Sequence, residues 1–328
     1  MRIEAFSQAR DPDQPAANED RFVILPGRAY AVIDGVSSRT PARHDGMLSG
    51  AYAAALVQRV VEREATVQTD GRQLVRTLTA AISEDYRARN MWQAVRDEVN
   101  LRFAATLALV LDRDDGIEIT LIGDSGVRLN CKVVHRVEKD IDGITATLRQ
   151  AAWRLVAGRS AEPALREQAS RQVVRHGTRQ PVLGVRDWFD EADMRAIEAA
   201  AEAACAGTYP ALDASMMDEL LHGGILNAQK RHQNNADSPL GYSCLDGFAV
   251  PDAFITTVTL PRDAVRTIEL FSDGYFAPGH GFGIDAWEAR FAEIERIDPT
   301  KTGQFPSVKG SLGRLASDDR TYVGVSMD

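Results

Sequence analysis

The hydrophobic and polar positions of this chain change period several times, and each change predicts a change of secondary structure. Two short apolar runs, RFVIL and AYAVID, occupy residues 21–34 on either side of a Pro26-Gly27 turn, which predicts an antiparallel hairpin. The Ala, Leu and Val positions of 46–64 then recur at helical spacing, and those of 71–90 predict a second helix.

Strand-like patterns return at Phe103. The segments FAATLALVLD, IEITLIG and VRLNCKVV follow one another with only the turns RDDG and DSG between them, which predicts a three-stranded meander. Three further apolar or β-branched segments, at 254–260, 264–271 and 320–327, predict strands near the end of the chain. The loops between consecutive strands are too short for parallel crossovers, so we expect antiparallel pairing.

The middle of the chain is mostly helical in pattern, with helical segments at 144–158, 187–207 and 215–232, and an Asp opens the second of them as an N-cap. Antiparallel strands with helices before and between them predict an α+β fold, in which one sheet packs on another and helices lie outside. We expect a single domain over 1–328 with a helical insertion at about 144–247. The insertion either stabilises the edge of the sheet or covers a site and selects substrates.

Composition narrows the class of protein. The apolar fraction is 44% and the charged fraction is 26%, as in soluble globular proteins, and no apolar run approaches the roughly 20 residues that span a bilayer. The net charge is −9, from 47 acidic and 38 basic side chains, and this charge repels the phosphate backbone of nucleic acids. We therefore expect neither a membrane nor a nucleic acid as a partner.

Two further features indicate the compartment. The N-terminal stretch MRIEAFSQARDPDQ lacks the apolar run of a secretory signal, so we expect a cytoplasmic protein. The three cysteines, Cys131, Cys205 and Cys244, are odd in number and have no CxxC spacing. This pattern predicts reduced, structural thiols and not a disulfide framework or a zinc site.

Several of the predicted strands begin or end beside a carboxylate. The acids placed in this way are Glu19, Asp20, Asp34, Asp124, Asp273 and Asp318. Each one alone is most simply a turn or capping residue. Strand ends at one edge of a sheet converge in space, however, and carboxylates gathered there repel one another unless a cation neutralises them. Ligands that are all oxygen atoms favour hard ions such as Mg²⁺ or Mn²⁺.

These acids belong to a set of motifs in a fixed order. The motifs are N-E-D (18–20), A-V-I-D-G (31–35), S-G with an Ala-rich helix (49–57), A-T-L-A-L-V (105–110), I-G-D-S-G (122–126), L-F-S-D-G (270–274) and S-D-D-R-T-Y-V-G-V (317–325). Through their order and spacing the chain resembles the metal-dependent Ser/Thr protein phosphatases of type 2C, as a bacterial-like member. The resemblance implies a four-layer α-β-β-α sandwich of two antiparallel sheets flanked by helices, with a two-metal site at one edge.

The resemblance also implies roles for particular residues. Asp34 would bridge two Mn²⁺ or Mg²⁺ ions, and the carbonyl of Gly35 would bind one of them. Asp273 and Asp318 would complete the ligands of one ion. Glu19 and Asp20 would lie on the side of the other ion, directly or through water.

Two acids of the motifs have lesser implied roles. Asp124 would hold a third, weaker ion. Asp319 ranks below Asp318, because relatives often carry Asn at its position. The mechanism needs no protein nucleophile, since two cations lower the pKa of a bridging water so that hydroxide can attack phosphorus, and Asp34 and Asp273 are the acids on which this depends.

The sequence departs from the family pattern at two places. Relatives often carry a His directly after the Asp-Gly as a general acid, whereas this chain has Val36 there, and His44 is the nearest substitute. Relatives also carry an Arg just before the N-E-D motif to bind the substrate phosphate. Arg10 is the nearest candidate here.

The implied function is a signalling hydrolase that removes phosphate from phosphoserine and phosphothreonine in a partner protein and opposes a cognate Ser/Thr kinase. Two alternatives stay open at the level of sequence. The missing Arg and His motivate a catalytically silent relative that binds a phosphorylated partner. The other alternative is a phosphatase for a small phosphorylated metabolite, since a deep cover over the site would exclude proteins. The complete set of metal acids favours the enzyme.

Overall fold

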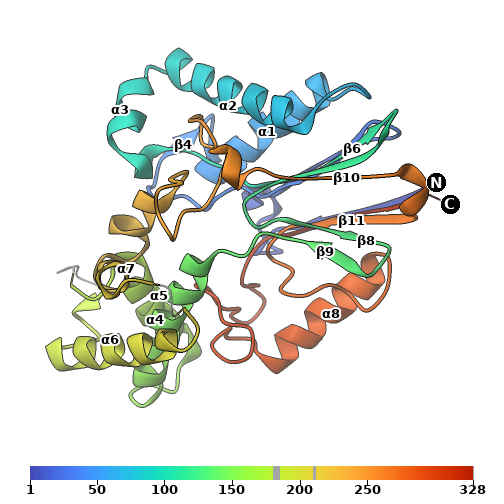
Figure 1. Ribbon diagram of the computed structural model, residues 1–328. Helices are drawn as coiled ribbons and strands as arrows, with labels where there is room; N and C mark the ends of the chain where they lie inside the picture. The colour runs from blue at the N-terminus through green and yellow to red at the C-terminus, as the bar shows by residue number, and fades with distance from the viewer. Residues whose placement is uncertain (180–184, 210–211, 328) are drawn as a thin grey trace.

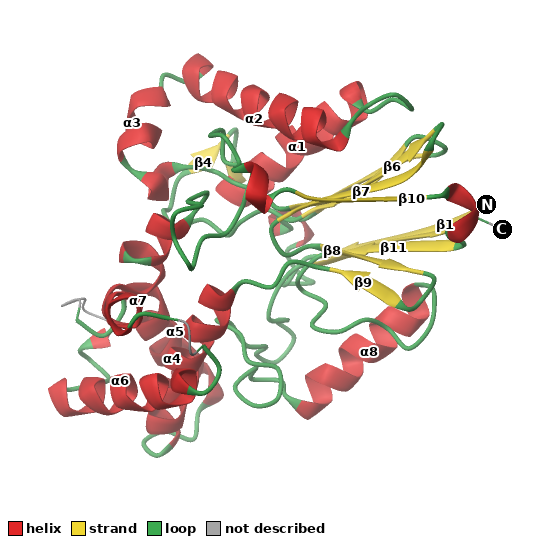
Figure 2. Ribbon diagram, in the orientation of Figure 1, coloured by secondary structure: helices red, strands yellow, loops and turns green. Residues whose placement is uncertain are grey.

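The computed structural model describes residues 1–179, 185–209 and 212–327. Within them, two five-stranded antiparallel sheets lie face to face, with helices on their outer faces (Figures 1 and 2). This arrangement confirms the expected α+β sandwich. Both chain termini lie at one end of the sandwich, and the helices that interrupt the strands lie beyond the other end (Figure 1).

The first sheet has the strand order β10-β7-β6-β3-β2. Its strands are β2 (Arg21–Leu25), β3 (Ala29–Ile33), β6 (Leu107–Arg113), β7 (Gly116–Ile122) and β10 (Thr256–Leu260). Arg21 faces Ile33 and Leu25 faces Ala29, so the hairpin predicted at 21–34 is confirmed. All residues of β3 and β7 are buried, because this sheet is covered on both faces.

The second sheet has the strand order β1-β12-β11-β8-β9. Its strands are β1 (Arg2–Gln8), β8 (Gly126–Leu129), β9 (Val133–His135), β11 (Thr267–Phe271) and β12 (Arg320–Ser326). The sequence did not identify β1, which pairs along its whole length with β12, from Arg2 opposite Ser326 to Gln8 opposite Arg320. The start of β12 therefore lies at the end of the sandwich away from the termini.

The predicted three-stranded meander is wrong in two respects. β6 pairs with β7 as expected, but β8 pairs with β11 in the other sheet. Residues 123–126 therefore cross from one sheet to the other, with Gly123 at φ +77°. The segment VRLNCKVV is also two strands and not one, because Asn130 and Cys131 both adopt positive φ and turn β8 back onto β9.

Helices cover the outer faces of the two sheets. Around the sandwich they are α1 (Ser49–Glu64), α2 (Gly71–Ala88), α3 (Trp92–Asp97) and α8 (Ile284–Ile297). The helices predicted at 46–64 and 71–90 correspond to α1 and α2, which lie over the first sheet (Figure 1). α8 lies on the side of the second sheet, and the sequence did not identify it. A small hairpin of β4 (Arg43–His44) and β5 (Met47–Leu48) precedes α1.

The main core has two layers. Between the sheets, fully buried side chains such as Val110 and Ile119 meet Leu270 and Val323 of the opposite sheet. A second layer packs the outer face of the first sheet against α1 and α2. The burial of each such side chain stabilises the folded state by roughly 1.5–3 kcal/mol. The two sheets therefore form a rigid support for the loops at their ends.

The helices beyond the end of the sandwich form a separate unit, here called the helical cap. Its members are α4 (Asp140–Ala157), α5 (Pro163–His176), α6 (Glu191–Ala206) and α7 (Ala214–Asn227). The cap has its own apolar core, with Leu148, Val173 and Leu220 fully buried. It begins slightly before the insertion expected at about 144–247. None of the described helices combines the length and the apolar composition that crossing a membrane requires.

Candidate active site

The strand ends opposite the termini bring three acids together. Asp34 follows β3, Asp124 follows β7 and Asp273 follows β11, so both sheets contribute. One carboxylate oxygen from each lies within 4.8 Å of the others. Residues separated by more than 200 positions in the sequence thus converge at one edge, as the strand-end pattern predicted.

Each Asp-Gly pair lies against a neighbouring backbone, and this explains the glycine. A Cβ on Gly35 would lie 2.3 Å from the carbonyl oxygen of Gly50 at the start of α1. A Cβ on Gly274 would lie 1.9 Å from the carbonyl oxygen of Asp319. No side chain fits at these separations, so the close approach that gathers the acids requires glycine after both Asp34 and Asp273.

Two further acids approach from the segment before β2. Asp20 accepts a hydrogen bond of 2.7 Å from the hydroxyl of Ser272, which is the residue before Asp273. The Oε1 atom of Glu19 is buried and has no hydrogen-bond partner among the described residues. An unpartnered buried carboxylate oxygen beside other carboxylates is the feature expected of a cation ligand.

Asp318 and Asp319 lie side by side but have different partners. Asp319 accepts hydrogen bonds from the backbone N–H groups of Arg10, at 2.5 Å, and Glu19, at 2.7 Å. It therefore fastens the N-terminal segment to the start of β12. Asp318 also lines the cavity, and its Oδ2 lies 2.6 Å from the Nζ of Lys309. The ranking of Asp318 above Asp319 as a metal ligand stays a prediction.

Burial and mutual repulsion shift the pKa values of these carboxyls. Burial raises the pKa of Asp20 and Asp34 well above the usual range, and for Asp34 the charges of Asp273 and Asp20 add to the shift. Burial also raises the pKa of Asp273 to about 7, with contributions from Asp124 and Asp318. The pKa of Glu19 is likewise raised to about 7, mainly by burial.

These observations fit a divalent metal centre. The side-chain donors are carboxylate oxygens, which hard ions such as Mg²⁺ and Mn²⁺ prefer. Burial and the neighbouring carboxylates raise the pKa values of Glu19, Asp20, Asp34 and Asp273, and a divalent cation would favour the ionised form of these four carboxyls. Glu19 offers a free buried oxygen for it.

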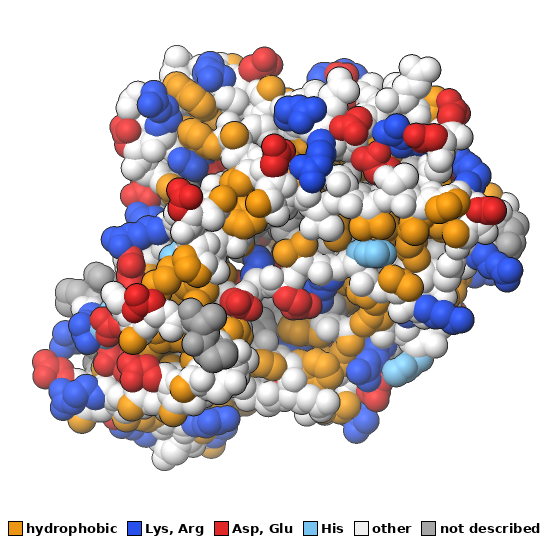
Figure 3. Space-filling model, viewed as in Figure 1, with side chains coloured by type: hydrophobic (Ala, Val, Ile, Leu, Met, Phe, Trp, Pro, Cys, Tyr) orange, Lys and Arg blue, Asp and Glu red, His pale blue; other side chains and the backbone are white. Residues whose placement is uncertain are grey.

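The acids open into a large cavity of about 1310 Å³ between the sandwich and the helical cap. Asp34, Asp124 and Asp273 line its floor, and Arg171 and Arg175 of α5 line it from the cap. Acidic and basic side chains are intermixed on the face of the molecule drawn in Figure 3. The volume of the cavity accommodates a charged ligand, and its walls carry both acidic and basic side chains.

The comparison with protein families decides what kind of site this is. A family model described as protein phosphatase 2C matches residues 12–302, which is most of the chain. The chain belongs to the protein phosphatase 2C family. This membership confirms the resemblance drawn from the motifs. The chain is a metal-dependent Ser/Thr protein phosphatase that uses Mn²⁺ or Mg²⁺.

Solved structures of other phosphatases align with this chain over nearly their whole length. The Mycobacterium tuberculosis serine/threonine phosphatase PstP/Ppp has 16% sequence identity and a TM-score of 0.46, covering 100% of this chain and 98% of its own. Stp1 from Staphylococcus aureus has 10% identity and a TM-score of 0.45, with 100% and 95% covered. The PstP catalytic domain with 2 manganese ions has 15% identity and a TM-score of 0.46, with 99% and 97% covered. No protein with a curated description matches this chain.

The two weaker site candidates of this protein phosphatase 2C chain lie in different surroundings. Arg10 lines the cavity, and its Nε donates a hydrogen bond of 2.7 Å to the carbonyl of Ala316, two residues before Asp318. His44 is buried in β4, with its ring 5.0 Å from that of Phe103 and 5.4 Å from that of Tyr52. The structure does not bring His44 to the cavity, so its geometry gives the general-acid role no support.

The structure also shows three cations that the sequence reasoning missed. Lys139, before α4, lies 2.7 Å from Asp124, and Lys309 lies 2.6 Å from Asp318. Burial acts to lower the pKa of Lys139, but the nearby carboxylates of Asp124 and Asp142 outweigh it and hold this pKa well above the usual range. Arg171 is the third. For the two lysines, the sequence offers one signal, which is that lysine is rare in this chain. Only five of the 38 basic residues are lysines.

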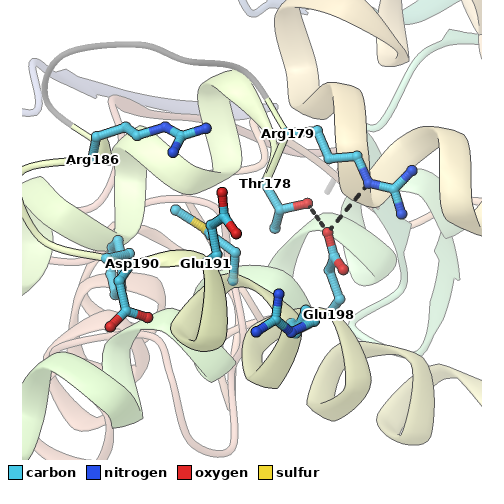
Figure 4. A pocket seen from close by; sticks show the side chains of 9 residues that line it. Thr178, Arg179, Arg186, Asp190, Glu191 and Glu198 are labelled. Atoms are coloured by element: carbon cyan, nitrogen blue, oxygen red, sulfur yellow. Dashed lines mark hydrogen bonds and ion pairs between the residues drawn. The ribbon is translucent and has the colours of Figure 1, made fainter.

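A second cavity of about 420 Å³ lies within the cap of this phosphatase. The labelled side chains in Figure 4 are Thr178, Arg179, Arg186, Asp190, Glu191 and Glu198. Thr178 donates a hydrogen bond to Glu198, and the Nε of Arg179 lies 3.9 Å from the same carboxylate. The described lining of this cavity contains none of the strand-end acids, so the larger cavity is the candidate active site.

Proposed function

We propose that this phosphatase hydrolyses phosphoserine and phosphothreonine in a partner protein at the acids that close the end of the sandwich. The observation that carries the proposal is the convergence of Asp34, Asp124 and Asp273 within 4.8 Å. It joins residues of both sheets at the floor of one cavity. We therefore assign the phosphatase activity of the family to this cluster of acids.

The proposed ligands divide between two ions. In this proposal Asp34 would serve both ions, the Gly35 carbonyl would bind one of them, and Asp273 and Asp318 would complete the ligands of one ion. Glu19 and Asp20 would lie on the side of the other ion, directly or through water, and the buried Oε1 of Glu19 has no hydrogen-bond partner among the described residues. When bound, the two cations lower the pKa of water for attack on phosphorus and neutralise charge on the phosphoryl oxygens.

The substrate phosphate needs positive groups of the chain as well. Arg10 lines the cavity from the sandwich, and Arg171 lines it from α5 of the cap. Burial lowers the pKa of Arg171, and the charge of Arg10 adds to this shift. Neither forms an ion pair with any residue in the described part of the chain. Two such groups without a carboxylate partner form a receptor for a phosphate dianion.

Two parts of the proposal concern the surroundings of the enzyme. A phosphoprotein substrate is made by a kinase, so we include a cognate Ser/Thr kinase as the opposing activity. We also place the chain in the cytoplasm. Its exposed cysteine, Cys131, is a free thiol, which suits a reducing compartment.

The test measures phosphate release from a phosphothreonine peptide and from para-nitrophenyl phosphate, with Mn²⁺ and then with a chelator. We expect turnover of both substrates with Mn²⁺ and none with chelator. Turnover of the small ester alone would favour a metabolite phosphatase. Turnover of neither substrate would leave a phospho-partner-binding protein.

The same assay tests the residues. Asp34→Asn and Asp273→Asn are each expected to lower kcat by more than about a hundredfold, because even indirect supports of a metal ligand contribute 10–100-fold. Asp263→Asn is the matched control, since Asp263 is an exposed acid of the 3₁₀ turn Arg262–Ala264, between β10 and β11. Full activity in either site variant would disprove the assignment of that acid.

A further inference from the structure

Lys139 is buried among the carboxylates of the proposed metal centre. Its Nζ lies 2.7 Å from Asp124 Oδ2 and 3.0 Å from Asp142 Oδ2. Only 16% of the Lys139 side chain and 9% of the Asp124 side chain are exposed. Asp124 in turn lies within 4.8 Å of Asp34 and Asp273. The ammonium group of Lys139 is therefore part of the same cluster of charges.

The helical cap supplies this lysine. Lys139 is the residue directly before α4, and Asp142 belongs to the first turn of that helix. The side-chain amide of Gln229, which follows α7, donates a hydrogen bond of 3.3 Å to the other oxygen of Asp142. Both ends of the cap thus hold the contact, and Asp124 on the sandwich receives a cation whose position the cap determines.

We propose that Lys139 is a built-in cation that takes the place of a third metal ion at Asp124. The centre of this enzyme then holds two divalent ions and no third. This inference rests on the proposed two-ion site, and it assigns Asp124 to the lysine and not to a metal.

Charge and size both support this assignment. An ammonium group at 2.7 Å donates directly to the Asp124 carboxylate and occupies the space that an ion bound to the same oxygen would need. A divalent ion placed there would also be repelled by the positive charge of Lys139 at close range.

The test counts bound manganese per full-length chain by equilibrium dialysis, with free Mn²⁺ measured by electron paramagnetic resonance up to millimolar concentration. We expect two ions in the wild type and three in Lys139→Gln. Lys139→Arg keeps the charge and should stay at two. Asp124→Asn combined with Lys139→Gln should return to two, and Lys132→Gln, at an exposed lysine, is the control.

The outcomes separate this inference from the proposed function. A third ion in the wild type, or only two in a folded Lys139→Gln variant, would overturn the inference and leave the phosphatase site intact. If Lys139→Gln does not fold, Asp124→Asn alone decides, because it should keep two ions at unchanged affinity, and loss of an ion would overturn the inference. A wild type that binds no manganese would overturn the proposed site and this inference together.

Discussion

At the scale of single residues, the acidic centre is a place where the fold opposes the ionisation of its own side chains. The pKa values of Glu19 and Asp273 are raised from ordinary values of 4.5 and 3.8 to about 7. A carboxyl whose pKa is higher in the folded state stabilises the fold fully below its ordinary pKa, and that contribution is lost as the pH rises through about 7.

The metal-free enzyme should therefore lose stability between about pH 4 and about pH 8. With Mn²⁺ in excess the trend should reverse, because protons compete with the metal and its affinity rises with pH over the same interval. Thermal unfolding in a pH series, with chelator and then with Mn²⁺, measures both slopes. A metal-free melting temperature that does not fall with pH would contradict the raised pKa values of Glu19 and Asp273.

Neutralising one acid should have opposite effects on stability and on activity. Asp34→Asn removes a buried charge next to Asp273 and Asp20, so the metal-free variant should melt a few degrees above the wild type at about pH 8. The added stability from Mn²⁺ should be smaller than in the wild type. Asp263→Asn should change neither quantity. A lower melting temperature for metal-free Asp34→Asn would show that repulsion does not dominate there.

At the scale of elements, a buried arginine connects the cap to the loop that carries Lys309. Arg149 of α4 has no exposed side-chain area and forms an ion pair with Glu167 of α5. It also donates hydrogen bonds to the carbonyls of Lys301 and Ser307, at 3.1 and 3.0 Å. These contacts hold the segment that delivers Lys309 to Asp318.

Arg149→Met should destabilise the protein by about 3–5 kcal/mol, because it leaves the buried Glu167 charge without a partner. The double variant with Glu167→Gln should lose clearly less, since no unpaired charge remains. Urea unfolding measures both free energies. Arg154→Met, at an exposed position of the same helix, should stay within about 0.5 kcal/mol of the wild type. Equal losses in the single and double variants would contradict this account.

Some elements of this fold could be predicted from the sequence and others could not. The hairpin at 21–34 and helices α1 and α2 follow from local periodicity and turns, and all are present. The pairing of β1 with β12 and of β8 with β11 does not follow from it, because the paired residues are far apart in the sequence, as Glu269 opposite Arg128, 141 residues away, shows. Local turn chemistry at 123–126 is compatible with either sheet.

The same contrast applies to the site. Asp34 and Asp273 could be predicted because an acid before glycine repeats at strand ends, and strand ends converge. Lys139, Lys309 and Arg171 could not, since they reach the cavity from a loop and from the cap. The placement of those segments depends on packing such as the Arg149 contacts, which no local pattern specifies.

At the scale of the whole molecule, the cavity is completed by two separately packed units. The sandwich supplies Arg10 and the acids, and the cap, with its own apolar core, supplies Arg171. Substrate binding then depends on how the two cores are held together. In the proposed function the cap is thus part of the phosphate-binding site.

Arg10→Gln and Arg171→Gln should each lower kcat/KM for a phosphothreonine peptide about tenfold or more, because a hydrogen bond to a charged group contributes about 1.5–3 kcal/mol. The loss should appear mainly in KM if the guanidinium groups bind the phosphate before reaction. Steady-state kinetics measures the division. Arg76→Gln, at an exposed position of α2, is the control. Unchanged kinetics for Arg171→Gln would remove the cap from phosphate binding.

The strand register also has a practical consequence. Arg2 pairs with Ser326 at one end of the second sheet, whereas Gln8 pairs with Arg320 at the end where the acids lie. Both termini therefore point away from the cavity (Figure 1). A purification handle, a fluorescent fusion or a linkage to a sensor chip at either terminus would leave the mouth of the enzyme free to capture phosphoproteins from solution.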